Sequence, residues 1–234
     1  MTEEGKQYKI FGRRKGKSLS NLQKEYFKNY INDFSIFKTN DDGALNLRKI
    51  NPKELFDGIE DIRLEIGFGM GDFLFEKALA HPNVGFVGCE VFENGVASLL
   101  AKIIKFKISN IRIHFGNCLD LIHNFNCLTL NKIYILFPDP WPKTRHAKRR
   151  IFSTSMLDKL AFCLKPGGSL RFASDHPVAK SWLLAEVLRN SAFSWTAQSA
   201  KDWRLRPSNW PQSRYMVKGE HEGRASSWFD FKRN

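Results

Sequence analysis

Three prolines that follow one apolar run are the strongest constraint on how this chain folds. The run is residues 132–136 (KIYIL), whose β-branched and aromatic side chains are typical of a buried parallel strand. Pro138, Pro140 and Pro142 come soon after it, and proline fits neither a helix interior nor a central strand. The chain must therefore leave the sheet at the carboxyl end of this strand, which is the edge where open α/β sheets bind ligands.

The turn that these prolines form carries an acid, an aromatic ring and a dense basic run. Asp139 lies between two prolines and beside Trp141, and residues 143–150 (KTRHAKRR) include five Lys or Arg. Basic side chains attract phosphate groups, and an aromatic face can stack on a base. The combination indicates chemistry on a nucleic acid base. A Pro-rich loop followed by a solvated basic run is the alternative interpretation.

Length and charge limit the function classes that remain. A chain of 234 residues can form one large α/β domain, or one domain with an appendage, and 42% hydrophobic residues argue against disorder. The net charge of +13 indicates a polyanionic partner, either nucleic acid or an anionic membrane surface. No apolar run approaches the roughly 20 residues of a membrane span, and the first ten residues lack a signal-peptide core. We therefore expect a cytoplasmic protein that binds nucleic acid and no membrane.

A strand followed by closely spaced glycines predicts a cofactor site. Residues 62–66 (IRLEI) form the expected strand, and Gly67, Gly69 and Gly71 lead into a predicted helix, an arrangement that lets a cofactor approach the backbone. Dinucleotide enzymes favour the spacing G-x-G-x-x-G, whereas the spacing here is G-x-G-x-G after Glu65. An acid suits the ammonium and sulfonium groups of S-adenosylmethionine better than it suits a pyrophosphate. We expect these residues to bind S-adenosylmethionine, with a nicotinamide dinucleotide as the alternative.

Two further strands end in polar residues that fit an adenosyl group. Residues 84–91 predict a strand that carries Glu90, an acid at the distance from the glycines that is typical of a ribose ligand. The alternative role for Glu90 is to cap the next helix. Residues 111–115 predict another strand, after which Asn117 can either accept a hydrogen bond from the adenine amine or simply form a turn.

The rest of the chain alternates predicted helices and strands. Periodicity predicts helices over residues 93–107 and 149–164, and a strand over residues 169–173. Asp175 follows that strand, where it either lies at the same edge as Asp139 or caps the next helix. This alternation predicts an α/β fold with a mostly parallel sheet.

The two ends of the chain differ from the middle. Residues 1–50 form a polar, basic extension that we expect to be partly flexible, and residues 51–234 form the main domain. Within the extension, residues 11–17 (FGRRKGK) are either a phosphate-binding arm or a solvated tail. Residues 201–215 are rich in Trp, Arg and Pro, which favours a binding loop. The four cysteines show no metal-ligand spacing, so no metal is expected.

Residues 137–150 resemble the bacterial tRNA (guanine-N7-)-methyltransferase family, whose pattern is F-P-D-P-W-x-K-x-R-H-x-K-R-R. Every fixed position of that pattern is present, and the likeness extends from residue 12 to the last predicted strand. The resemblance implies a Rossmann-like class I methyltransferase fold, with a mostly parallel seven-stranded sheet and helices on both faces. It also implies transfer of a methyl group from S-adenosylmethionine to guanine N7 in the variable loop of tRNA, which leaves S-adenosylhomocysteine. The implied partner is tRNA, without an obligate protein partner, and the protein is a monomer or homodimer.

The resemblance also implies roles for single residues. Asp139 corresponds to the catalytic acid of the family. Contacts to S-adenosylmethionine correspond to Glu65, Glu90 and Asn117, beside the glycines named above. Contacts to the substrate guanosine correspond to Lys143, Asp175, Ser213, Tyr215 and Met216. The tRNA-contacting run corresponds to Arg145, His146, Lys148, Arg149 and Arg150.

One motif near the end of the chain departs from the family pattern. The family has T-x-x-E near its end, whereas this chain has Ser213 and Met216 at the two matching positions. Serine keeps the hydroxyl group, but a methionine carries no charge. Either Glu220 or Glu222 substitutes from the next turn, or activity is weakened. The alternatives are therefore a non-catalytic RNA-binding protein of the same fold, or a methyltransferase for another RNA guanine.

Overall fold

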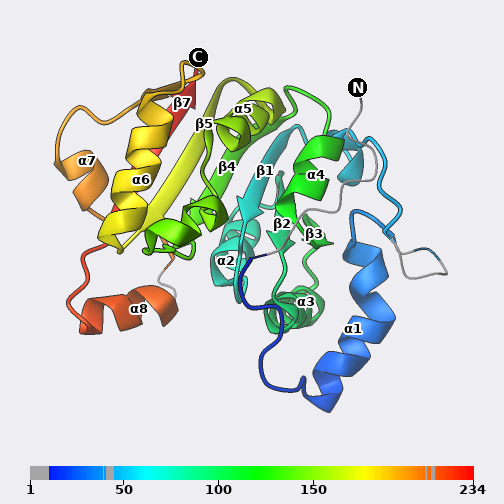
Figure 1. Cartoon of the computed structure of the whole chain (residues 1–234). Helices are drawn as coiled ribbons and strands as arrows, with labels where there is room; N and C mark the ends of the chain where they lie inside the picture. The colour runs from blue at the N-terminus through cyan, green and yellow to red at the C-terminus, as the bar shows by residue number, and fades with distance from the viewer. Residues whose placement is uncertain (1–10, 39, 41–44, 209, 212–213) are drawn as a thin grey trace.

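Seven strands form one sheet in the order β3-β2-β1-β4-β5-β7-β6 (Figure 1). The computed structural model describes residues 11–38, 40, 45–208, 210–211 and 214–234. The strand bounds are Asp61–Ile66 (β1), Val84–Glu90 (β2), Ile111–Phe115 (β3), Leu130–Leu136 (β4), Leu164–Ser174 (β5), Phe193–Trp195 (β6) and Ser227–Arg233 (β7). Neighbours among β1 to β5 pair in parallel, and β7 is antiparallel to β5 and β6. The predicted mostly parallel seven-stranded sheet is confirmed.

Helices cover both faces of the sheet. One set packs against the largest apolar core and comprises α4 (Cys118–Asn124), α5 (Thr154–Cys163) and α6 (Pro177–Leu188). The other set encloses a second core and comprises α1 (Asn21–Phe34), α2 (Asp72–Ala80) and α3 (Glu93–Phe106). The short helices are η1 (Pro52–Leu55), η2 (Thr144–Arg149), α7 (Lys201–Arg204) and α8 (Arg214–His221). None of the helices in the described part of the chain has both the length and the apolar character of a membrane span.

Side chains alternate along β1 between the main core and the opposite face of the sheet. Ile62, Leu64 and Ile66 are buried in the main core. Arg63 and Glu65 lie between them in the sequence and therefore point to the opposite face. Glu65 is nevertheless only 2% exposed, so a carboxyl group is buried at the carboxyl end of the central strand.

Two predicted elements differ from those observed. The helix expected over residues 149–164 begins at Thr154, because Ser153 Oγ accepts a hydrogen bond from the Met156 amide at 3.2 Å and caps it. The basic residues before it form η2 instead. The loop expected over residues 201–215 contains α7 and the start of α8. Helix α4 carried too short an apolar pattern to be predicted.

The first 50 residues are tied to the main domain at several described positions. Ser20 and Gln23 form a capping box that starts α1. Beyond the helix, Ile36, Phe37 and Ile50 are buried in the main core. The Ile36 amide donates to the Ile113 carbonyl at 3.0 Å, and the Ile50 amide donates to the Asn124 carbonyl at 2.8 Å. Residues 1–10 and 41–44 of the extension that we expected to be partly flexible lie outside the described residues.

The main core predicts a large loss of stability when one central ring is removed. Phe172 is fully buried on β5 and contacts the Phe152 and Phe229 rings. We expect Phe172→Ala to lower the free energy of unfolding by about 3–5 kcal/mol, because it leaves a cavity. Phe162 is 55% exposed, so Phe162→Ala is the matched control, with a change within about 0.5 kcal/mol. Urea unfolding followed by circular dichroism measures both, and equal losses would contradict this packing.

Candidate active site

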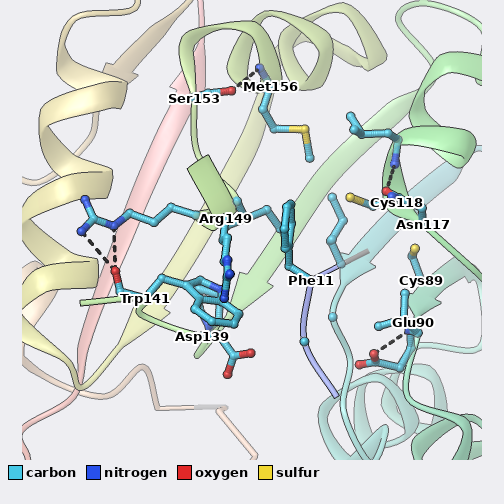
Figure 2. A pocket seen from close by; sticks show the side chains of 18 of the residues that line it. Phe11, Cys89, Glu90, Asn117, Cys118, Asp139, Trp141, Arg149, Ser153 and Met156 are labelled. Carbon is cyan, nitrogen blue, oxygen red and sulfur yellow. Dashed lines mark hydrogen bonds between the residues drawn. The ribbon is translucent and has the colours of Figure 1, made fainter. Parts of the chain in front are cut away.

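A cavity of about 900 Å³ opens at the carboxyl ends of the parallel strands. Figure 2 shows Glu90 and Asn117 on one side of it and Asp139 and Trp141 on the other, with the Phe11 ring between them. The residues predicted from sequence that line it are Gly67, Glu90, Asn117, Asp139, Lys148, Arg149 and Arg150. The fold therefore brings together groups from three separate predicted motifs.

A second cavity, of about 210 Å³, lies next to the first and shares Gly67, Leu136 and Phe137 with it. The other predicted residues that line it are Glu65, Gly69 and Met216. The larger cavity thus carries Glu90 and Asn117, and the smaller one carries Glu65. This separation matches an elongated ligand with a polar group at each end.

Glu65 is the most perturbed carboxyl group of the site. Burial, together with the charges of Glu90 and Asp72, raises its pKa from 4.5 to about 8. Among the described residues, no hydrogen-bond partner reaches its Oε2 atom. A buried carboxyl oxygen without a partner is costly. A cationic group in the second cavity would satisfy it.

Glu90 ties the glycine loop to the end of β2. Its Oε2 atom accepts a hydrogen bond from the Gly69 amide at 2.7 Å, and Oε1 accepts from the Val91 and Phe92 amides at 2.6 and 3.0 Å. Burial raises the pKa of Glu90, whereas these three backbone bonds oppose the rise. The N-cap residue of α3 is Phe92, so the alternative role of Glu90 as a helix cap is wrong.

Asn117 is the N-cap of α4. Its Oδ1 atom accepts a hydrogen bond from the Leu119 amide at 3.0 Å. A carbonyl oxygen has two lone pairs, so this bond leaves room for a second donor. The capping role explains why an Asn stands after β3, and its position in the cavity keeps the predicted adenine contact open.

The close approach of α3 to the glycine loop depends on glycine at two positions. A Cβ atom at Gly95 would lie 2.0 Å from the Gly69 carbonyl oxygen, a contact that no side chain tolerates. Gly69 itself has a φ of 55°, in the left-handed region that favours glycine. No atom lies within 4 Å of a Cβ built there, so the loop faces open space. The loop is shaped to leave room for a ligand.

Arg150 holds the Pro-rich turn in an unusual backbone conformation. Phe137 and Trp141 have positive φ values of 49° and 40°, which non-glycine residues rarely adopt. Arg150 Nε and Nη2 donate to the Trp141 carbonyl at 3.2 and 3.1 Å. The guanidinium carbon also lies 4.3 Å from the ring centroid of Trp182 on α6. Arg150 thus links the turn to the main body, besides lining the cavity.

The other cations of the basic run are presented outward. Lys143, Arg145, Lys148 and Arg149 are exposed. The Arg149 guanidinium carbon lies 4.9 Å from the Trp141 ring centroid and 5.6 Å from that of Phe11. These positions leave the charges accessible to an anionic partner, as the sequence predicts.

Asp175 is buried in an ion pair. Its side chain is 3% exposed, and its Oδ2 atom accepts a hydrogen bond from Arg224 Nε at 2.6 Å. Arg224 also pairs with Glu222. The alternative role of Asp175 as a helix cap is wrong, because His176 is the N-cap of α6 and its Nδ1 atom accepts from the Val178 amide.

Met216 lies in an apolar cluster under the second cavity. It is 1% exposed and packs in one cluster with Phe73, Tyr134, Trp210 and Trp228. The position that carries an acid in the family pattern is therefore part of a small hydrophobic core here. Ser213 and the side chain of Tyr215, both predicted substrate contacts, lie outside the described residues.

The N-terminal segment contributes a wall of the larger cavity that sequence reasoning missed. Phe11, Gly12 and Arg13 line this cavity. The segment is anchored on α3, where Asn94 Oδ1 accepts from the Gly16 amide at 2.7 Å and Asn94 Nδ2 donates to the Lys17 carbonyl at 2.7 Å. The basic residues at 11–17 indicated a role for this segment, but its sequence did not predict a contact with the cavity. The other lining residues that were not predicted include Cys89, Cys118, Ser153, Met156 and Lys159.

Comparisons with known proteins agree with this geometry. The profile of a family described as "Putative methyltransferase" matches residues 60–227. A solved structure of the 16S rRNA methyltransferase KamB superposes with a TM-score of 0.54 at 13% identity, covering 84% of this chain and 95% of that one. The chain therefore has the fold of a class I S-adenosylmethionine-dependent methyltransferase.

Curated relatives define the family more narrowly. A tRNA (guanine-N(7)-)-methyltransferase of Rhodopseudomonas palustris (strain BisB5) is 41% identical over 228 residues, which span 96% of this chain and 86% of that protein. A protein of the same name from Zymomonas mobilis is 36% identical over 225 residues, which span 96% of this chain and 94% of its own length. The chain belongs to the tRNA (guanine-N(7)-)-methyltransferase family.

The contacts of Arg150 predict that the Pro-rich turn becomes more mobile when the paired hydrogen bonds to the Trp141 carbonyl are removed. Lysine keeps the charge but cannot make the paired bonds, so we expect Arg150→Lys to speed amide exchange in residues 137–150 about tenfold. Arg145 is exposed, and Arg145→Lys is the matched control that leaves exchange unchanged. Hydrogen–deuterium exchange with mass spectrometry measures both. Identical protection of the turn in the two variants would show that Arg150 does not hold it.

Proposed function

We propose that this protein transfers a methyl group from S-adenosylmethionine to N7 of a guanine in the variable loop of tRNA. The observation that carries the proposal is the joining, in one cavity, of the glycine loop, Glu90 and Asn117 with Asp139 and the basic run. Family membership at 36–41% identity over 96% of the chain supports the same reaction. We expect the reaction to occur in the cytoplasm, and a monomer or homodimer remains the predicted assembly.

The residues at the strand ends fit S-adenosylmethionine. Glu65 Oε2 is buried and accepts no hydrogen bond from the part of the chain that the structure describes, so it suits the ammonium group of the cofactor's methionine part. Glu90 and Asn117 would hold the ribose and adenine in the larger cavity, where both residues lie. When bound, the cofactor supplies an electrophilic methyl group on a sulfonium sulfur. The shared wall of Gly67, Leu136 and Phe137 lies between the two binding regions.

Methylation at guanine N7 requires correct alignment of the reacting atoms more than it requires a catalytic general base. N7 carries an in-plane lone pair and no proton, so no group has to create the nucleophile. Correct orientation of the two reacting atoms alone can contribute several kcal/mol. The strained turn at residues 137–141 is held by Arg150, which keeps Asp139 at the cavity rim. A rigid turn is what such alignment requires.

Asp139 supplies the charge that the reaction uses. Positive charge moves onto the purine as the new bond forms, and a carboxylate beside the base stabilises that charge. The same carboxylate can accept hydrogen bonds from guanine N1 and its amino group. Asp175 is another acid at this edge, and its pairing with Arg224 favours a supporting role in shaping the guanosine site.

The burial of Met216 bears on whether activity is full or weakened. An acid at this apolar position would add a further carboxyl group to the cavity that Glu65 and Asp72 already line, and Glu65 already has a raised pKa. Methionine avoids that repulsion and packs against the Phe73 and Trp210 cluster. We therefore favour an active enzyme. A catalytically weakened RNA-binding protein is the alternative, distinguished by cofactor and tRNA binding without methyl transfer.

The role of Asp139 predicts a loss of turnover without loss of cofactor. We expect Asp139→Asn to lower kcat by about 100-fold or more, because the stabilising charge is gone. Affinity for S-adenosylhomocysteine should stay within about twofold, since Asp139 contacts the base rather than the cofactor. Transfer of labelled methyl to tRNA, followed by nucleoside analysis for 7-methylguanosine, measures the rate. Asp57 is exposed just before β1, at the opposite edge of the sheet, and Asp57→Asn is the control. Normal turnover in Asp139→Asn would remove Asp139 from the mechanism.

The raised pKa of Glu65 predicts proton release when cofactor binds. At pH 7 a carboxyl group with a pKa of about 8 is mostly protonated in the free protein. An ammonium group beside it favours the carboxylate, so its pKa falls and up to about one proton leaves. Calorimetric titration with S-adenosylhomocysteine in two buffers of different ionisation enthalpy counts that proton. We expect Glu65→Gln to bind more weakly and to abolish the release. Equal proton counts in the two proteins would show that Glu65 does not meet the ammonium group.

A further inference from the structure

A row of basic side chains crosses the sheet on the face opposite the main core. The strand registers place Arg63 of β1 beside Lys132 of β4, and the uncharged Ser169 of β5 lies between Lys132 and Lys232 of β7, so three cations lie on one line across the sheet. The sequence neighbours of these residues, among them Leu64, Ile133, Leu170 and Phe231, are buried in the main core. Alternation along each strand therefore puts the whole row on the other face. We call Arg63, Lys132 and Lys232 the basic row.

The basic row is unfavourable without a partner. Adjacent strands lie about 4.8 Å apart, and like charges placed directly side by side destabilise a sheet. Burial, together with the charges of Arg171, Arg63 and Lys77, lowers the pKa of Lys132 to about 8 against the opposing effect of Asp230. The pKa of Lys77, on α2, is lowered by burial and then by Arg171 and Arg63. The cations on this face repel one another.

Two carboxylates compensate only part of this charge. Asp61 binds Arg63, with Oδ2 accepting from Nη2 at 2.6 Å. Asp230 binds Arg171, with Oδ1 accepting from Nε at 2.6 Å. The same Oδ1 atom lies 4.0 Å from Lys132 Nζ, which is too far for a hydrogen bond. Lys132 is therefore left with excess charge, and it remains accessible because its side chain is 22% exposed. Lys232 is exposed at the β7 end of the row.

Aromatic rings connect the basic row to the methyl-transfer site. Lys132 Nζ lies 5.3 Å from the Tyr134 ring centroid, and the Arg171 guanidinium carbon lies 5.3 Å from that of Trp210. The Phe73 ring contacts both Tyr134 and Trp210, at 4.9 and 4.7 Å between centroids. Phe73 and Trp210 line the second cavity. Lys132 of the basic row thus contacts the same aromatic cluster that lines the second cavity.

We propose that the basic row binds phosphate groups of the RNA strand that flanks the target guanine. This inference rests on the proposed function. An extended line of cations fits a chain of regularly spaced phosphates, and it continues outward from a cavity in which a base is handled. The formal charge of +13 and the basic run at residues 143–150, on the other side of the site, fit the same partner. Substrate RNA would then be held on both sides of the guanine.

The test is the salt dependence of tRNA binding, measured without turnover in the presence of S-adenosylhomocysteine. A Lys that contacts phosphate contributes about one unit to the slope of log affinity against log salt. We expect Lys132→Gln and Lys232→Gln each to lower that slope by about one unit, and the double variant by about two. Lys201 is exposed on α7, whose neighbour Trp203 stacks on Phe229 of the main-core face. Lys201→Gln is therefore the matched control and should keep the wild-type slope.

Thermal unfolding supplies a second readout. Removal of the Lys132 charge relieves repulsion, so we expect the melting temperature of Lys132→Gln to equal or exceed that of the wild type. Lys232→Gln changes an exposed residue and tests the row even if Lys132→Gln folds poorly. A wild-type slope in Lys232→Gln and in the double variant would overturn the proposal and leave an acidic protein as the partner to examine. Methyl transfer by the unaltered protein is assayed separately, so failure of the proposed function would be visible independently of the basic row.

Discussion

The parallel pairing of β1 with β4 at the centre of the sheet is the constraint on which the site depends. Their register puts Glu65 beside Tyr134, so the two strands end next to each other. The glycine loop follows the carboxyl end of β1, and the strained turn at residues 137–141 follows the carboxyl end of β4. Because parallel strands share a carboxyl edge, the glycine loop and the Pro-rich turn meet there although their motifs lie far apart in the sequence. Each apolar residue that seats β1 and β4 on the main core thus helps to position the chemistry.

Electrostatics divide this edge into an acidic interior and a basic exterior. Glu65 and Glu90 are buried, and burial raises the pKa of both. Lys148 and Arg149 of η2 line the larger cavity and are exposed to solvent. Such a division suits two ligands of opposite charge: a cofactor with cationic groups goes inside, and a polyanion stays outside. Met216 adds no further acid to this interior, where another carboxylate would oppose the ionisation of Glu65.

Arginine fulfils structural roles within a basic protein as well as binding roles. Arg150 belongs by sequence to the basic run. Its guanidinium group, however, donates two hydrogen bonds to the Trp141 carbonyl and lies over the Trp182 ring. Arg224 neutralises Asp175, and Arg171 neutralises Asp230. Exposed charges remain on the outward cations of the basic run and on Lys232 of the basic row, whereas Arg63 of that row is paired with Asp61. Net charge alone could not separate the two groups.

The sequence by itself determined the strands, the Gly67–Gly71 loop and the Pro-rich turn, because periodicity, glycine spacing and proline act within a few residues. It also indicated Glu65, Glu90, Asn117 and Asp139 as the polar ends of strands, and the structure places all of them at the two adjoining cavities. Other properties depend on register and on contacts between residues far apart in the chain. Only the tertiary structure decided that Phe11 enters the cavity, that Arg150 braces the turn, that position 216 is apolar core, and that strands far apart in sequence align their cations in one row. A local sequence pattern cannot specify these contacts, because the order of the strands in the sheet decides which distant residues become neighbours.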